Sequence, residues 1–99
     1  LPFMSPEQLL GHPDDVDART DIWGLGVTLR VLLVGQVPFA GESLEEVSRR
    51  VREQEPVPVR VIDPRLPRAV DAIVQRALAK SPWNRFPSAE AMAEALAIV

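Results

Sequence analysis

The sequence predicts an all-α fold in which several shorter helices surround one long, buried helix. Three observations lead to this prediction. Residues 19–34 are apolar on almost every side, which is typical of a helix buried in a core. Apolar residues recur at helical spacing in the segments that follow. No segment alternates apolar and polar residues over the length of a strand, and ten prolines separate the apolar segments.

The first helix is expected to begin directly after Ser5 and to end at Gly11. Ser5 suits the N-cap, Pro6 suits the first helical position, and Gln8 completes a capping box by bonding back to the cap. The long central helix then covers residues 19–34, and Gly35 is expected to end it.

The third helix is expected to begin at a second capping box, formed by Ser43 and Glu46. This helix has Leu44, Val47 and Val51 on one side and is amphipathic, so we expect it to lie at the periphery. An extended connection should follow over residues 55–66, because prolines within it disfavour helix.

The last two helices are expected to start at Pro67 and after Ser88. The first of them should end near Lys80, and residues 83–87 should form a loop. Apolar side chains at helical spacing mark the buried face of each helix: Val70, Ile73, Val74, Ala77 and Leu78 in one, and Ala89, Met92, Ala93 and Leu96 in the other.

Composition excludes several classes of protein. The 99 residues are 46% hydrophobic and 25% charged, enough apolar residues for the core of one small domain or part of a larger one. The absence of cysteine excludes disulfides and thiolate metal sites. A net charge of −3 with mixed signs does not favour binding to nucleic acid, and no apolar run is long enough to span a membrane. We therefore expect a cytoplasmic location, and membrane tethering of a longer parent protein outside this segment stays open.

Four short motifs, in this order along the chain, resemble the large lobe of a protein kinase. They are FMSPE at 3–7, DIWGLG at 21–26, PF at 38–39 and KSPWNR at 80–85. The resemblance is strongest to bacterial members of the eukaryotic-type Ser/Thr kinase family. It implies that residues 1–99 are a partial kinase domain, from the end of the activation segment to the last helix. The fold would be that of a helical fragment of the large lobe, in which the other helices surround the buried central helix at 19–34.

The resemblance implies a role for five residues. The motif that ends at Glu7 resembles the Ala-Pro-Glu that closes a kinase activation segment, and Arg85 stands where the partner of that glutamate is expected. Asp21 resembles the aspartate that anchors the catalytic loop. Leu1 and Met4 resemble the apolar substrate pocket. Without the resemblance, Asp21 would be read as a helix cap, and the two charges of Glu7 and Arg85 as unrelated surface charges.

The residues that perform phosphoryl transfer in this family are missing from the sequence. The reaction needs a Gly-rich loop, a strand lysine, a catalytic-loop aspartate with its asparagine, and an Asp-Phe-Gly motif for magnesium. Gly24 and Gly26 lie inside a helical run instead of after a strand. We therefore expect no catalytic, cofactor-binding or metal-binding residue in this segment. ATP and Mg²⁺ would bind to the parent domain, and the isolated segment would be inactive.

Two partners follow from the resemblance: a protein substrate and the rest of the kinase domain. The chain does not begin with methionine, so we expect it to be a piece of a longer protein. Two alternatives remain open. The segment can belong to a pseudokinase or a helical protein-interaction module that keeps this scaffold without catalysis, or to an unrelated all-α binding domain.

Overall fold

The architecture is entirely helical over residues 4–11 and 18–99, the part of the chain that the computed structural model describes. No strand occurs in these residues, so the all-α prediction is confirmed. The helices are α1 (Pro6–Leu9), α2 (Ala18–Val34), α3 (Leu44–Glu53), α4 (Val59–Ile62), α5 (Arg68–Ala77) and α6 (Ala89–Ala97), with a 3₁₀ turn at Pro82–Asn84.

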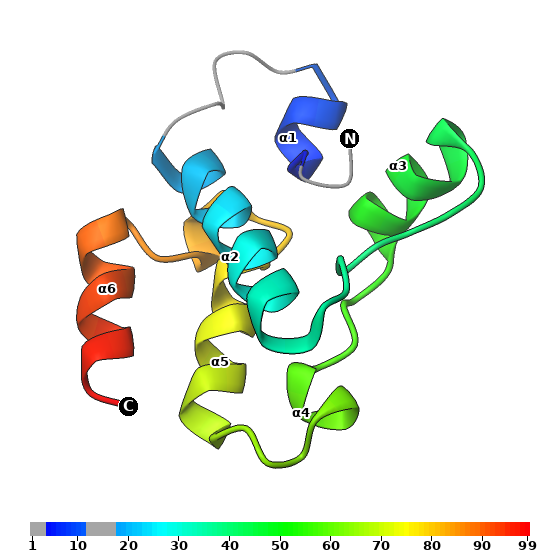
Figure 1. Ribbon diagram of the computed structural model, residues 1–99. Helices are drawn as coiled ribbons and strands as arrows, with labels where there is room; N and C mark the ends of the chain where they lie inside the picture. Colours follow the sequence, from blue (N-terminus) through cyan, green and yellow to red (C-terminus); the bar gives the residue numbers. More distant parts are fainter. Residues whose placement is uncertain (1–3, 12–17) are drawn as a thin grey trace.

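Helix α2 is central, and α5 and α6 pack against it (Figure 1). Ile22, Trp23 and Val27 of α2 are fully buried. Gly26 allows the close approach of α5, because a Cβ atom at this position would lie 2.7 Å from the Cβ of Ala77. Gly26, which lies inside a helical run of the sequence, therefore serves the packing of α2 against α5.

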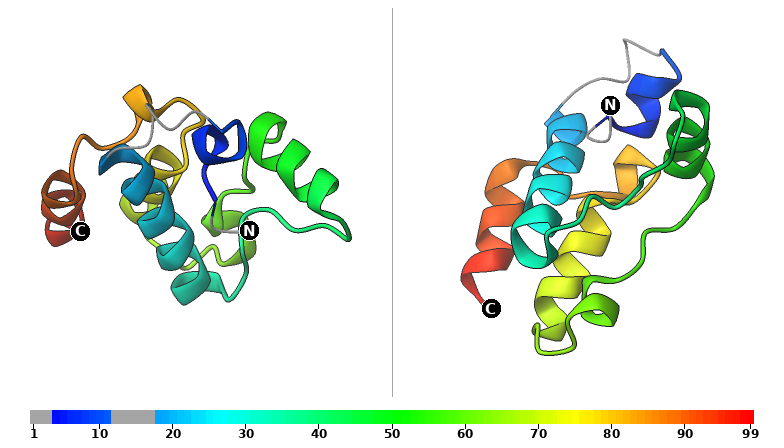
Figure 2. Two further views of the ribbon diagram at one scale, coloured as in Figure 1. Left: turned by 90° about the horizontal axis from the view of Figure 1, so that it is seen from above. Right: turned by 45° about the vertical axis from the view of Figure 1, so that its right-hand side comes forward.

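Helix α3 lies apart from the bundle of α2, α5 and α6, and packs beside α1 (Figure 2). The molecule measures 35 × 29 × 17 Å. Its two apolar clusters meet along α2. One consists of Trp23, Val27, Phe39, Val47, Val51, Val59, Val74 and Leu78, and the other of Ile22, Ile73, Ala77, Phe86 and Met92.

The helix ends follow the local sequence signals. Ser5 and Gln8 form a complete capping box, in which the backbone N–H of Ser5 donates to the Gln8 side chain at 2.9 Å. Ser88 caps α6 by accepting from the backbone N–H of Ala91. Gly11 and Gly35 have φ of 71° and 72°, a left-handed conformation that ends a helix and that glycine adopts without strain.

Four expectations for the segments between residues 43 and 80 are wrong in detail. Glu46 does not bond back to the N-cap Ser43 but accepts from the backbone N–H of Glu42 at 3.1 Å. Leu44 is 61% exposed, because the core contacts of α3 are made by other residues. Helix α5 ends at Ala77, and the connection over 55–66 contains the short helix α4.

The buried face of α6 also differs from the expected one. Met92 and Leu96 pack inward as expected, but Ala89 and Ala93 are exposed. Ala91 and Ala95 contact the core in their place. Alanines occupy every side of this helix, so the sequence pattern could not distinguish the faces.

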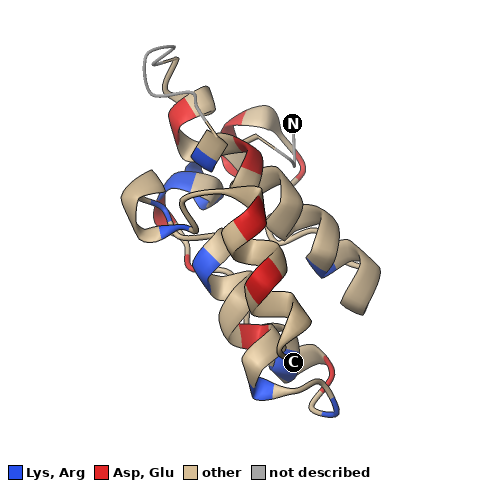
Figure 3. Cartoon of the chain, turned by 90° about the vertical axis from the view of Figure 1, so that its left-hand side faces the viewer, with Lys and Arg blue, Asp and Glu red and all other residues tan. Residues whose placement is uncertain are grey.

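One side of α2 is open in this segment, although Ile22, Trp23 and Val27 on its other sides are fully buried. Leu25 is 43% exposed and Leu32 is 78% exposed. Both line an apolar groove of about 390 Å³ between α2 and α6. Figure 3 shows the side of the molecule that carries α6, where Lys and Arg occur together with Asp and Glu. Among the described residues, no helix has the length and apolar character needed to cross a membrane.

Candidate functional site

The structure brings together Glu7 and Arg85, which are 78 residues apart in sequence. Arg85 Nη1 lies 2.6 Å from Glu7 Oε2, and Nη2 lies 2.9 Å from Oε1. The planar guanidinium thus meets the carboxylate through two parallel hydrogen bonds. Both residues are buried, with 5% of Glu7 and 1% of Arg85 exposed. The pair joins α1 to the loop that precedes α6.

Arg85 also donates to three backbone carbonyls. Its Nε bonds to Ala79 at 2.8 Å, Nη1 to Arg19 at 3.1 Å and Nη2 to Lys80 at 3.2 Å. Together with the two bonds to Glu7, all five N–H groups of the guanidinium have acceptors. A buried charge that is this fully bonded fixes the relative positions of α1, the start of α2 and the loop after α5.

Thr20 is a third member of this cluster, and its hydroxyl donates to Glu7 Oε2 at 2.7 Å. Burial alone would raise the pKa of Glu7, but the hydrogen bonds from Arg85 and Thr20 outweigh it and hold the pKa below its usual value. Glu7 is therefore ionised at neutral pH. No spacing rule links Thr20 to Glu7, so this contact could not be predicted from the sequence.

The cluster rests on an aromatic pair. Trp23 is fully buried and stacks on Phe39, with ring centroids 6.2 Å apart, which confirms that this tryptophan is a core residue. The Arg85 guanidinium lies 5.0 Å from the Trp23 ring centre, and the Lys80 ammonium lies 4.1 Å from that of Phe39. Both cations therefore contact the faces of buried rings.

Lys80 links this cluster to α3, because its ammonium donates to the backbone carbonyl of Val51 at 2.5 Å. Burial lowers the pKa of Lys80 to about 8, since removal from water disfavours the charged form. The carboxylate of Glu55 acts in the opposite direction, and the positive charge of Arg85 lowers the pKa further.

The lowered pKa of Lys80 predicts that stability increases at alkaline pH. Above about pH 8 the folded chain loses a proton that the unfolded chain keeps up to its usual pKa of 10.5. The unfolded state then binds more protons, so the free energy of unfolding should rise between these pH values, by about 1–2 kcal/mol after allowance for partial exposure.

Urea unfolding at a series of pH values measures this rise. The sequence has one lysine and no tyrosine or cysteine, so no other side chain is expected to titrate in this window. Replacement of Lys80 by methionine should therefore abolish the rise. A rise of equal size in Lys80→Met would show that Lys80 is not its source.

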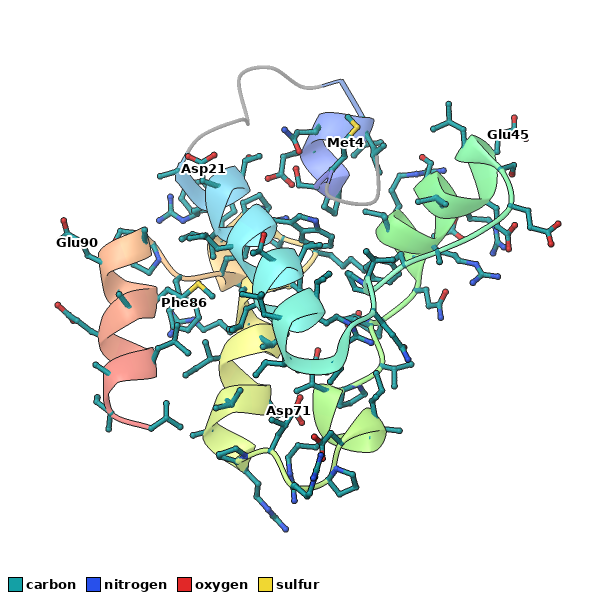
Figure 4. All side chains as sticks on the ribbon, in the orientation of Figure 1. Met4, Asp21, Glu45, Asp71, Phe86 and Glu90 are labelled. Atoms are coloured by element: carbon teal, nitrogen blue, oxygen red, sulfur yellow. The ribbon has the colours of Figure 1, made fainter. Side chains whose placement is uncertain are left out.

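The other residues singled out by the sequence lie outside this cluster. Asp21 is exposed in the first turn of α2, and its carboxylate bonds to no other residue within 4–11 and 18–99. Met4 is half-buried just before α1, and Figure 4 shows Met4 and Asp21 at the same end of the molecule. Leu1 lies outside the described residues.

Two arrangements typical of metal and phosphate sites do not occur in the described residues. Within residues 4–11 and 18–99, no three acidic or histidine side chains come together in a way that could hold a metal ion. Gly24 and Gly26 are interior residues of α2, so their backbone amides belong to the helix and do not cradle a phosphate.

Known proteins with similar sequences are bacterial protein kinases, although no protein-family model matches the chain. The Ser/Thr protein kinase PksC of Streptomyces coelicolor is 44% identical over 90 residues, which are 91% of this chain and 16% of PksC. The Ser/Thr protein kinase PknB of Mycobacterium tuberculosis is 40% identical over 91% of this chain and 14% of PknB. The tyrosine-protein kinase MasK of Myxococcus xanthus is 40% identical over 95% of this chain and 14% of MasK.

The fold is also similar to part of a solved kinase structure. The twitchin kinase region of C. elegans superimposes with a TM-score of 0.80 at 27% identity, covering 97% of this chain and 16% of that one. This chain therefore matches only 14–16% of the length of each of these proteins.

Proposed function

We propose that this chain, a homologue of a segment of bacterial Ser/Thr protein kinases, forms the C-terminal part of the large lobe of a kinase domain. It would run from the end of the activation segment to the last helix. The observation that carries this proposal is the 44% identity to PksC over 91% of the chain. The helical fold and its likeness to the twitchin kinase region support it.

The parent domain would transfer the γ-phosphate of ATP to a protein hydroxyl with the help of Mg²⁺. The rest of the domain would bind ATP and Mg²⁺, and this segment would supply scaffold and a surface for the substrate. The similarity to PksC and PknB, which are named Ser/Thr kinases, supports serine and threonine as the residues that the parent kinase would phosphorylate. The name of MasK refers to tyrosine instead. The parent kinase would act on proteins in the cytoplasm.

In this proposal the Glu7–Arg85 pair is structural. It would hold α1, at the end of the activation segment, against the C-terminal part of the lobe. The two parallel hydrogen bonds and the burial of both residues support this role. Two parallel bonds resist rotation of the guanidinium relative to the carboxylate as well as separation of the two groups.

Asp21 would anchor the catalytic loop by accepting hydrogen bonds from its backbone. Its carboxylate is exposed at the first turn of α2 and has no acceptor role within the described residues, which supports a partner elsewhere in the domain. Met4, with Leu1, would line the pocket for the substrate residue that follows the phosphorylated hydroxyl. The position of Met4 just before α1 supports this.

The apolar groove between α2 and α6 would be covered by the rest of the kinase domain. Leu25 and Leu32 expose apolar side chains there, together with Met92 and Leu96. A soluble domain rarely leaves such a surface in contact with water. The groove therefore supports the proposal that the segment is one part of a larger folded unit.

Phosphate transfer from radiolabelled ATP to a protein substrate by the full-length protein, in the presence of Mg²⁺, tests the proposal. The 99-residue chain alone should transfer none. Asp21→Asn should lower kcat by about 10- to 100-fold, because a displaced catalytic loop misaligns the reacting groups. Glu90→Gln, at an exposed acid of α6, should leave kcat unchanged.

Failure of the full-length protein to bind ATP or to transfer phosphate would favour the alternative, a pseudokinase or helical interaction module. Equal activity of Asp21→Asn and Glu90→Gln would exclude the anchoring role of Asp21 but not the kinase activity itself.

A further inference from the structure

Residues 57–69 form an exposed edge of the molecule, which we call the α4 edge. The segment contains α4, the loop that follows it and the first residues of α5. Figure 1 and the right-hand view of Figure 2 show α4 and this loop at the lower end of the molecule, opposite α1. No residue of the α4 edge lines the groove between α2 and α6, so the edge is a separate surface.

The side chains that the α4 edge exposes are of two kinds. Most are apolar residues or prolines, and the rest are arginines; in chain order they are Val57, Pro58, Val61, Ile62, Pro64, Arg65, Pro67, Arg68 and Ala69. Val61 is the most exposed of the large apolar side chains, at 68%. None of the exposed residues is acidic, although the whole chain has a net charge of −3 and both α3 and α6 expose glutamates. The α4 edge is therefore an apolar and basic surface on an otherwise acidic chain.

The acid that the edge contains does not balance its arginines. Asp63 is half-buried, and Arg65 meets its carboxylate through two bonds of 2.9 and 3.1 Å. Arg68 is exposed, and no ion pair joins it to another residue of the described ranges 4–11 and 18–99. The next acid along the chain, Asp71, is half-buried and accepts from the backbone N–H of Val59 at 3.2 Å. Its carboxylate thus bonds to the start of α4 and not to Arg68.

Arg60 gives the edge a further positive charge and also holds its shape. The guanidinium donates to the backbone carbonyls of Leu66 and Pro64, at 2.9 and 3.4 Å, and not to a carboxylate. The backbone N–H of Leu66 donates to the carbonyl of Asp63 at 3.1 Å. These bonds tie the loop to α4, so the apolar side chains are presented on a preformed surface.

The size and place of the edge favour a lipid surface over a protein partner. Nine exposed residues are well short of the about 20–30 that each side of a stable protein interface contributes. A bilayer makes no such demand, because shallow insertion of a few apolar side chains adds to the attraction between arginines and lipid phosphates. An edge at one end of the molecule also meets a flat surface before the other helices do.

We propose that residues 57–69 rest on the surface of a bilayer that contains anionic phospholipids. The apolar side chains of Val61 and Ile62 enter the boundary between headgroups and acyl chains, and Arg68 faces the lipid phosphates. Peripheral contact of this kind needs no membrane-spanning helix. It leaves the opposite end of the molecule, which carries Met4 and Asp21, directed away from the lipid (Figure 4). The inference goes beyond the proposed function and does not depend on catalysis.

Co-sedimentation of the full-length protein with vesicles tests the proposal. Vesicles of phosphatidylcholine with phosphatidylglycerol should bind more protein than vesicles of phosphatidylcholine alone, and salt should weaken this binding. Arg68→Gln should weaken it about fivefold, the usual effect of one arginine near an anionic surface. Val61→Gln should also weaken it, because a polar side chain inserts poorly. Asp63→Asn should strengthen binding, since it removes the acid of the edge and releases Arg65.

Two matched controls come from α3, which lies away from the edge. Arg52→Gln removes another exposed arginine, and Leu44→Gln alters a leucine that is 61% exposed. Both should bind the vesicles as the unaltered protein does. Amide hydrogen exchange, read by mass spectrometry, locates the contact. Exchange should slow at residues 57–69 when vesicles with phosphatidylglycerol are added, and should stay unchanged in α6.

Four results would overturn the proposal. One is equal binding to the two kinds of vesicle, and another is an equal effect of Arg68→Gln and Arg52→Gln. The third is binding of a polyglutamate peptide without binding of vesicles, which would identify an acidic protein as the occupant. The fourth is self-association of the protein that Val61→Gln abolishes, which would identify a second copy. All four measurements are made without ATP, so a failure of the kinase assignment would leave them unaffected.

Discussion

Replacement of Arg85 by alanine is expected to lower the free energy of unfolding by about 3–5 kcal/mol, the usual cost of breaking a buried ion pair. The loss arises because Glu7 would remain buried without its bidentate partner, and the three carbonyls that Arg85 bonds would lose a donor. Glu7→Ala should cost a similar amount, because it leaves the guanidinium buried and underbonded.

A double-mutant cycle, measured by urea unfolding, shows whether the two residues act as a pair. The double variant should lose much less than the sum of the single variants, because neither charge is left alone. Arg85→Lys should recover only part of the loss, since an ammonium cannot form the two parallel bonds. Simple additivity in the cycle would mean that the two residues make no energetic contact.

The pair of Asp63 and Arg65 provides a matched control. Arg65 also meets its carboxylate through two bonds, of 2.9 and 3.1 Å, but its side chain is 90% exposed. Arg65→Ala should therefore leave the unfolding midpoint unchanged within error, because water replaces an exposed partner. A large loss in this control would show that geometry and not burial determines the effect at Arg85.

Alanine substitutions at the two glycines of α2 are expected to have opposite effects. A Cβ atom at Gly26 would lie 2.7 Å from Ala77 and 3.2 Å from Leu78, so Gly26→Ala forces α5 away from α2. Such overpacking costs about 1–3 kcal/mol, which exceeds the gain in helix propensity. A Cβ atom at Gly24 meets nothing within 4 Å, so Gly24→Ala should stabilise by about 0.5–1 kcal/mol.

Thermal unfolding of the two variants, followed by circular dichroism, measures this difference. Both substitutions add the same methyl group to the same helix, so they differ only in what the group meets. If Gly26→Ala proves as stable as Gly24→Ala, α2 and α5 do not approach as closely as described.

Local signals in the sequence were sufficient to predict every helix except α4, and many of the helix ends. The N-cap serines at Ser5 and Ser88 and the terminal glycines at Gly11 and Gly35 act through bonds and backbone angles within a few residues. Glu7 and Arg85 were matched only because the motifs around them resemble those of kinases. Their spacing alone carries no such information.

Contacts that depend on the three-dimensional arrangement could not be predicted. Thr20 meets Glu7 because α1 and the start of α2 converge on Arg85, and no pattern within either helix indicates this. The residues that form the open face of α2, Leu25 and Leu32, could not be identified either, since apolar residues indicate that a surface is suited to burial but not which element covers it.

The long separation between Glu7 and Arg85 has a consequence for the kinetics of folding. Joining residues 78 positions apart closes a large loop, at an entropic cost of about 4 kcal/mol on the logarithmic scale for flexible chains. The ion pair should therefore form late, after the helices have docked and most of this entropy has been lost. A contact absent from the transition state affects the rate of unfolding more than the rate of folding. The pair would thus prolong the lifetime of the folded state without making that state quicker to reach.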